Sequence, residues 1–362
     1  MKKIKYASLF LLTGLMLAAC GNSEATDSNT DGDSNTSGGD NKKTYTLTVN
    51  NFEPAGANID VNVYQVWEKL VEEKTEGQVD VDIQNGGVLG PPVSMHTDLE
   101  AGLFDVGLVI ANYAYDTKFF PYTVATLPFS AENSKQAAEL LTEFTDKVVN
   151  KDEIQLQVSD AFTSDGYDLV SNKPIDVTDF KGLKMRASTA AESKFVQALG
   201  GSPVGLKINE TYEGLQKGTI NTSFVSSTQT EAYLIYEVAP YVKRINFTYT
   251  PLIPAMNQTF YNNLSDDLKV LFDEELMPAL ADIAIEAYVK VAEETYVRTQ
   301  EHVKEKGEFS VATEEEKNVL KAASQSAWDA WAKDADDRGY DGAALVQTYL
   351  ELLDEKNIPR PY

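Results

Sequence analysis

The chain carries the stretch Lys181-Gly182-Leu183-Lys184-Met185-Arg186, which is typical of a turn followed by a short strand. Side chains alternate along a strand, so Leu183 and Met185 face one side while Lys184 and Arg186 face the other. Arg186 stands where the strand ends, and in open α/β sheets the carboxyl ends of strands line the ligand crevice. A guanidinium there presents a planar set of donors that matches a carboxylate. From the residues alone, an ordinary surface or ion-paired arginine remains the alternative.

The segments before this stretch alternate between strand and helix patterns. Residues 45–49 and 79–83 alternate apolar and polar side chains, as on half-buried strands, and residues 59–71 have apolar positions at helical spacing. Gly77 falls where a left-handed helix cap is expected. Residues 105–110 form a nearly continuous apolar run, typical of a buried parallel strand. This order predicts a parallel sheet with helices on its faces.

A second set of the same kind follows, without a residue-level repeat. Its expected strands cover residues 154–158, 183–185 and 219–225, with a helix over about 190–199 and a shorter one starting at 209 or 210. A much longer helix is expected from Leu268 to about Lys306, interrupted at Pro278, and its apolar stripe is not a sustained heptad. Two more helices are expected at about 313–336 and 342–355.

The predicted fold is therefore α/β, with two lobes that contain mixed sheets and a long helix that bridges them. The expected organisation is residues 1–19 as a signal peptide, 20–43 as a tether, 44–165 mainly as the first lobe, 166–260 mainly as the second, and 261–362 as the long helix and C-terminal helices.

The composition excludes several classes of function. Lys and Arg number 31 against 56 Asp and Glu, which gives a formal charge of −25 and a pI near 4.4. Such a surface repels phosphate backbones and anionic lipid headgroups, so we expect no nucleic-acid partner and no electrostatic membrane adhesion. A local cation inside a closed cleft can still bind an anion, because distant charges are screened.

The N-terminus has the pattern of a cleaved, lipid-modified export signal. Three lysines precede an apolar run at residues 7–19, which is too short to span a bilayer as a helix, and Leu17-Ala18-Ala19 stands directly before Cys20. This sequence resembles the lipobox of bacterial lipoproteins, in which the peptide is cut before the cysteine and the thiol is acylated. Ordinary secretory cleavage that leaves a free thiol is the alternative. Residues 21–43 lack large apolar side chains and suit a flexible tether with a reach of roughly 25 Å. We therefore expect a protein anchored on the outer face of the cytoplasmic membrane.

Motifs for catalysis, metal or cofactors are scarce. His96 and His302 have no second His or Cys at metal-ligand spacing, and no nucleophile elbow, Walker loop or dinucleotide motif occurs. Cys20 is the only cysteine, so no disulfide or zinc cluster is expected. We expect no cofactor, no metal and no catalytic residues. A secreted enzyme that uses a carboxylate pair in the cleft between the lobes is the alternative from a different class.

Several motifs together resemble the DctP-type substrate-binding proteins of TRAP transporters. They are Lys181 to Arg186, Leu199-Gly200-Gly201-Ser202-Pro203, and Glu210-Thr211-Tyr212-Glu213-Gly214-Leu215-Gln216-Lys217-Gly218. In the N-terminal half, Thr75-Glu76-Gly77, Val88-Leu89-Gly90, Gly102-Leu103-Phe104-Asp105 and Leu127-Pro128-Phe129 occur in the order of the family. Asn263-Leu264-Ser265-Asp266-Asp267-Leu268 resembles the start of its long helix. The resemblance covers the chain from about Tyr45 almost to its end.

This resemblance implies a two-lobed receptor that closes around a small organic acid and delivers it to a membrane permease driven by an ion gradient. Arg186 falls on the signature arginine of the family, which typically pairs with the ligand's carboxylate. Tyr167 falls where some members carry a second ligand-facing arginine. Asn221 replaces an Asp that many members have, and Phe224 lies just beyond it, where polar residues are common. These departures imply a less polar pocket and question a dicarboxylate ligand.

The remaining candidate contacts follow the first and third strands. Asn51 and Phe52 come directly after the first, and Asn112 and Tyr113 directly after the third, so all four are expected at the mouth of the cleft. The aromatic residues among them could equally belong to the core. Two related functions stay open, a receptor for an ABC importer and a receptor that feeds a membrane sensor. The long helix favours the TRAP receptor over the ABC one.

Overall fold

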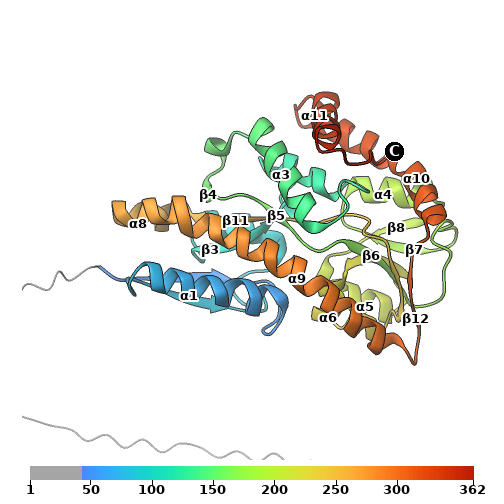
Figure 1. Cartoon of the computed structure of the whole chain (residues 1–362), viewed down its shortest axis with the longest axis horizontal. Helices are drawn as coiled ribbons and strands as arrows, with labels where there is room; N and C mark the ends of the chain where they lie inside the picture. Colours follow the sequence, from blue (N-terminus) through green and yellow to red (C-terminus); the bar gives the residue numbers. More distant parts are fainter. Residues whose placement is uncertain (1–42) are drawn as a thin grey trace, which may run out of the picture. The chain divides into compact units, whose positions relative to one another are not determined.

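Two six-stranded mixed β-sheets carry the fold of the computed structural model, which describes residues 43–362 (Figure 1). The predicted signal peptide, the lipidation site at Cys20 and nearly all of the predicted tether lie outside the described residues. The first sheet has the order β2-β1-β3-β11-β4, and β5 pairs with β11. Its strands are β1 (Tyr45–Asn50), β2 (Val79–Gln84), β3 (Val106–Ile110), β4 (Leu156–Val158), β5 (Phe162–Thr163) and β11 (Pro251–Asn257).

The first sheet is parallel where the sequence predicts it. β1 pairs in parallel with both β2 and β3, while β11 runs antiparallel to β3, β4 and β5. Its helices are α1 (Gln65–Lys74), α2 (Met95–Glu100) and α3 (Ser134–Val148), and a π-helical turn (Ile59–Tyr64) precedes α1. Gly77 has a φ of 74° after α1, which is the left-handed conformation expected there.

The second sheet has the order β12-β10-β6-β9-β7-β8. Its strands are β6 (Tyr167–Ser171), β7 (Lys184–Ala187), β8 (Ser202–Gly205), β9 (Thr222–Ser226), β10 (Tyr241–Arg244) and β12 (Glu308–Val311). The accompanying helices are α4 (Ala190–Ala198), α5 (Thr211–Gln216) and α6 (Ser227–Ala232). Strands β7 and β9 are parallel, so both end at the same edge of the sheet.

Two neighbouring segments connect the sheets, one between β5 and β6 and one between β10 and β11. The backbone N–H of Phe247 donates to the Tyr167 carbonyl at 2.7 Å, and the Tyr167 N–H donates to the Thr248 carbonyl at 2.9 Å. The Asp168 carboxylate accepts from the N–H groups of Ile245 and Asn246 at 2.7 and 3.1 Å. The two connections are therefore hydrogen-bonded to each other over their length.

The long helix is present and is interrupted near the expected proline. α8 (Asp266–Leu271) leads through a π-helical segment (Phe272–Leu276) into α9 (Met277–Val303), and Pro278 is the second residue of α9. Proline lacks the N–H that a regular helix uses, which accounts for the irregular turn before it. α9 packs against α3 and β11 beside the first sheet, and against α6 and β12 of the second (Figure 1). The predicted α/β class with two mixed sheets and a bridging helix is confirmed.

The C-terminal helices match their expected limits closely. They are α10 (Glu314–Asp337), which begins with a capping box between Thr313 and Glu316, and α11 (Gly342–Glu355). A short α7 (Gln258–Asn263) follows β11. Single 3₁₀ turns lie at Pro92–Ser94, Ala111–Tyr113, Lys151–Glu153, Ile208–Glu210 and Ile235–Glu237, and a longer 3₁₀ segment covers Phe120–Thr126. Within residues 43–362, no helix combines the length and apolar character that a membrane span needs.

Candidate functional site

Arg186 is a buried cation at the carboxyl end of β7. Its side chain is 4% exposed, and it is the only buried lysine or arginine among residues 43–362. Its Nε donates to the Leu206 carbonyl at 3.0 Å, but no carboxylate of the described residues lies within 4.0 Å of its nitrogens. Buried charges are normally paired, because desolvation of an isolated ion is costly. The positive charge of Arg186 is therefore not paired with a carboxylate from residues 43–362.

Two tyrosines, Tyr167 and Tyr233, lie within electrostatic range of this guanidinium. Burial raises the pKa of Tyr167 to about 12, and the charge of Arg186 acts against that increase. The Tyr167 hydroxyl forms a 2.6 Å hydrogen bond with Thr250 Oγ1. Burial also raises the pKa of Tyr233. The nearby Glu53, Tyr113 and Tyr167 raise this pKa further, and the charge of Arg186 lowers it. Tyr167 and Tyr233 therefore lie near Arg186, and Tyr113 lies near both of these tyrosines.

Tyr113 comes from the first sheet and reaches the second. It follows β3, and its hydroxyl accepts a hydrogen bond from the Ile208 N–H at 3.3 Å. Ile208 belongs to the turn that precedes α5. Because β1 and β3 are parallel, the residues after both strands lie at one edge of the first sheet. Ile208 is two residues from Leu206, whose carbonyl accepts from Arg186, so Tyr113 contacts the same segment as Arg186.

The other predicted residues after β1 and β3 are buried at the same edge. The Asn51 amide is used within the loop, since Nδ2 donates to Asn85 at 2.8 Å and Oδ1 accepts from the Glu53 N–H at 3.1 Å. Phe52 is 6% exposed and belongs to the main hydrophobic core. Asn112 is 7% exposed, and its Oδ1 has no hydrogen-bond partner among the described residues. Ligand contact remains a prediction for these three residues.

Asn221 and Phe224 lie apart from this group. Asn221 precedes β9, and its Oδ1 accepts from the Lys184 N–H at 3.0 Å, at the start of β7 and not at its end. Phe224 is 3% exposed and stacks on Phe247 with ring centroids 4.0 Å apart. Asn221 therefore lies at the amino edge of the second sheet, opposite to Arg186, and Phe224 forms part of an aromatic core.

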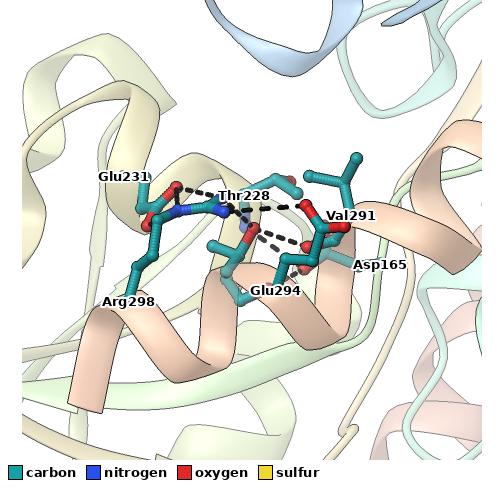
Figure 2. Close-up of polar contacts among 8 residues, drawn as sticks. Asp165, Thr228, Glu231, Val291, Glu294 and Arg298 are labelled. Carbon is teal, nitrogen blue, oxygen red and sulfur yellow. Dashed lines mark hydrogen bonds and ion pairs between the residues drawn. The ribbon is translucent and has the colours of Figure 1, made fainter. Parts of the chain in front are cut away.

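Two buried acids were not anticipated from the sequence. Glu53 is 1% exposed, and burial raises its pKa to about 7. Asp165 lies in the first connection between the sheets and accepts from Ser227 Oγ at 2.6 Å and from Thr228 Oγ1 at 2.5 Å (Figure 2). Burial raises the pKa of Asp165, while these hydrogen bonds from the start of α6 oppose the shift. In a chain with 56 acids, sequence offers no signal that separates these two.

Two pockets are lined by residues that neighbour this group in the chain, and neither is lined by Arg186, Tyr113 or Tyr167. One of 450 Å³ is lined by Ala187 and Ser188, which directly follow Arg186, and by Tyr115, Trp331 and Arg338 from the opposite wall. Another of 430 Å³ lies between the loop after β1, α6 and α9. Figure 2 shows some of the residues that line the second pocket, among them Arg298, which forms a bidentate pair with Glu231 and lies near Glu294.

No cluster of three potential metal-ligating side chains occurs in residues 43–362. His302 stacks on Tyr236 at 4.2 Å, and His96 packs edge-on against Phe119 at 6.5 Å, so the two histidines have separate aromatic neighbours. The described residues thus contain a buried guanidinium that no carboxylate pairs with, and no evident metal site.

The model of the DctP family, described as bacterial extracellular solute-binding protein family 7, matches residues 51–334. This chain belongs to that family. The resemblance to TRAP transporter solute-binding proteins is thereby confirmed. Proteins of family 7 are extracytoplasmic transport receptors that bind small ligands and work with a membrane permease, and they are not enzymes.

Individual relatives of this family 7 protein agree with the assignment. A solute-binding protein of Sulfitobacter sp. (strain NAS-14.1) is 28% identical over 216 residues, which cover 57% of this chain and 64% of that relative. A marine metagenome TRAP solute-binding protein, specific for aromatic acids and solved with 3-hydroxybenzoate, has 25% identity and a TM-score of 0.78, with 86% of this chain and 99% of that one covered. A TRAP protein from Rhodoferax ferrireducens T118, solved with copurified benzoate, shares the fold at 22% identity and a TM-score of 0.76, covering 86% and 98%.

Proposed function

We propose that this protein is the receptor of a TRAP transporter that captures a small organic acid between its two sheets and delivers it to an ion-gradient-driven permease. Arg186 binds the carboxylate, and Tyr113 and Tyr167 line the site from the two sheets. The similarity to the aromatic-acid receptor of the marine metagenome supports acids with a ring among the candidates.

The unpaired buried charge of Arg186 carries this proposal. A carboxylate can accept two parallel hydrogen bonds from a guanidinium, and Nε of Arg186 already donates to Leu206, which fixes the orientation of the group. A bound carboxylate would neutralise the charge of the Arg186 guanidinium, which no carboxylate of the described residues does. In a desolvated cleft, loss of one partner of such a pair costs roughly 2 to 5 kcal/mol.

Arg186→Ala tests this role by calorimetry with a panel that includes 3-hydroxybenzoate, benzoate and succinate. The best ligand of the panel should bind the variant about 30-fold or more weakly, at 1.4 kcal/mol per decade. Lys184→Ala is the matched control, because Lys184 lies two residues earlier on the same strand and is exposed. Near-normal affinity in Arg186→Ala would remove Arg186 from the site.

The rival functions make different predictions in the same experiment. A receptor returns the ligand unmodified, and saturating ligand raises the melting temperature by mass action. If nuclear magnetic resonance showed that the acid is consumed during incubation, a secreted enzyme would replace the receptor. Binding without transport in a strain that contains the permease would favour a sensory role or an ABC importer.

We further propose that Cys20 anchors the receptor by a lipid on the outer face of the membrane. The basis is the Leu17-Ala18-Ala19-Cys20 sequence. Cys20→Ala should release the protein into the medium or the soluble fraction, and retention of this variant in washed membranes would contradict the anchor.

A further inference from the structure

We propose that the 450 Å³ pocket beside α4 and α10 is a second binding site, which takes an uncharged aromatic ring with a hydroxyl group, that is, a phenol. Arg186 does not line this pocket, so the inference goes beyond the proposed function and does not depend on it. The ligand class differs from a carboxylate in charge and in hydrogen bonding.

Three parts of the chain form the walls of this pocket. They are the segment after β3, from Tyr115 to Thr126, the start of α4, and the end of α10. Helices α4 and α10 pack against each other beside the second sheet (Figure 1). A volume of 450 Å³ lies in the range of small-molecule sites, which are concave, mostly apolar and equipped with a few polar groups.

One wall of the pocket is a rigid aromatic surface. Phe120 stacks on Trp331 with ring centroids 5.2 Å apart and planes inclined by 14°, and both side chains are buried. Trp331 Nε1 donates to Thr123 Oγ1 at 2.8 Å, which fixes the indole ring. Tyr115 adds a third, partly exposed ring to the lining. Because aromatic rings pack well on one another in offset or edge-on contacts, this wall favours a flat aromatic ligand.

The charges of the pocket disfavour an ionic ligand. Arg338 is the only cationic side chain in the lining, and its guanidinium is paired with Asp116 at 3.1 Å and with Asp334 at 3.2 Å. Two carboxylates beside one guanidinium leave a local excess of negative charge, which repels a carboxylate ligand. A cationic ligand would lie next to the guanidinium that already binds both acids. The pocket therefore suits an uncharged molecule.

The polar atoms of the lining call for a hydroxyl group. On the side of α4, Ser188 Oγ donates to Glu192 at 2.7 Å. Ser193 Oγ donates to the Thr189 carbonyl at 3.0 Å. Both serine hydrogens are thus used within the protein, and the oxygens can only accept from a ligand. Arg338 Nε, in contrast, is a buried donor without a hydrogen-bond partner among the described residues. A hydroxyl group can donate to a serine oxygen or accept from Arg338 Nε, so it matches either wall.

The test follows the indole N–H signal of Trp331 in nuclear magnetic resonance spectra, assigned with Trp331→Phe. Phenol should shift this signal until saturation, and it should bind at least about tenfold more tightly than anisole, whose methylated oxygen cannot donate. Absence of a shift with phenol, or equal affinities for phenol and anisole, would overturn the inference.

Benzoate tests the exclusion of anions, and Arg186→Ala separates the two sites. In Arg186→Ala, phenol should bind with the affinity of the wild type, while benzoate should leave the Trp331 signal in place. Loss of phenol binding in this variant would mean that phenol occupies the site of Arg186, and a benzoate-induced shift would contradict the charge argument. Either result would refute the second site. The effect of the same variant on acid binding concerns only the proposed function.

A variant that fills the pocket locates the bound phenol. Ala190 lines the pocket at the first position of α4 and is exposed, so Ala190→Phe should occupy the space without disturbing the core, and it should abolish the phenol-induced shift. Ala198→Phe is the matched control, because Ala198 is exposed at the other end of the same helix and does not line the pocket. Undiminished phenol binding in Ala190→Phe would exclude this pocket as the site.

Discussion

The Tyr113 hydroxyl accepts a hydrogen bond from the Ile208 N–H at 3.3 Å, and this contact joins the two sheets across the site. Tyr113 belongs to the turn after β3, and Ile208 to the turn before α5. The contact exists only when the carboxyl edges of the two sheets are close together. It therefore stabilises the arrangement of the two sheets seen here over any arrangement in which they separate.

Tyr113→Phe should weaken ligand binding by roughly fivefold, since a net hydrogen bond contributes about 1 kcal/mol. The change should appear as faster dissociation in stopped-flow measurements, because the bond forms after the ligand has entered. Tyr241→Phe, which removes a hydroxyl from β10, should leave both constants unchanged. An unaltered dissociation rate in Tyr113→Phe would show that this contact plays no part in closure.

The ligand-free protein should lose stability as the pH rises from about 4.5 to 7. Burial raises the pKa of Glu53 and of Asp168 to about 7, and protonation of each therefore favours the folded state. Because the folded pKa exceeds the unfolded one, this stability is complete below the unfolded value and disappears as the pH passes the folded value. Shifts of this size correspond to roughly 3 to 4 kcal/mol each in the free energy of unfolding.

Urea unfolding at pH 5 and pH 8 measures the difference in the free energy of unfolding between the two pH values. Two isosteric variants separate the contribution of these two buried acids from that of general charge repulsion. Glu53→Gln and Asp168→Asn should each reduce the loss of stability between the two pH values. The amide oxygen that Asp168→Asn introduces can still accept from the N–H groups of Ile245 and Asn246, so the fold should persist in the second variant. Equal pH dependence in wild type and variants would contradict the assignment.

Gly307→Ala should destabilise the protein by about 3 kcal/mol or more. Gly307 lies between α9 and β12, and a Cβ there would be 2.0 Å from the Pro240 carbonyl oxygen, so the backbone of one strand must move. Gly205→Ala is the matched control, because a Cβ at Gly205 meets no heavy atom within 4 Å. Thermal unfolding should show a large decrease only for the first variant, and equal melting temperatures would refute the predicted clash.

Elements with strong local signals could be predicted from the sequence almost to the residue. The helix expected at 342–355 has these limits in the structure, and the one expected at 313–336 begins one residue later, after the Thr313 capping box. Capping residues and apolar periodicity act within a few residues, so the pattern contains the information.

Local patterns do not predict which strands pair with each other. The sequence pattern places the range 166–260 mainly in the second lobe, yet β11 within it lies in the centre of the first sheet, and β12 at Glu308–Val311 joins the second. Pairing depends on contacts between residues that are far apart along the chain, and local patterns do not specify it. The position of Asn221 could not be predicted for the same reason, because it depends on the register between β7 and β9, which places Asn221 beside Lys184.

Only part of the candidate site could be predicted from the sequence, because burial also depends on contacts between distant residues. Strand alternation and the family motif both pointed to Arg186, and the structure confirms that it is buried at the end of its strand. The burial of Glu53 has no comparable signal, because nothing in the sequence distinguishes it from the other acids among the 56.

The central place of β11 has a consequence for synthesis of the chain. Residues 43–163 supply five strands of the first sheet, but β3 and β4 are joined only through β11, which leaves the ribosome about 90 residues after β5. The nascent first half therefore waits, with an unpaired edge at β3, until most of the second sheet has been translated. A gene fragment that ends before β11 should yield an aggregation-prone product, and a cell exporting this receptor must keep the early chain from associating until the late strand arrives.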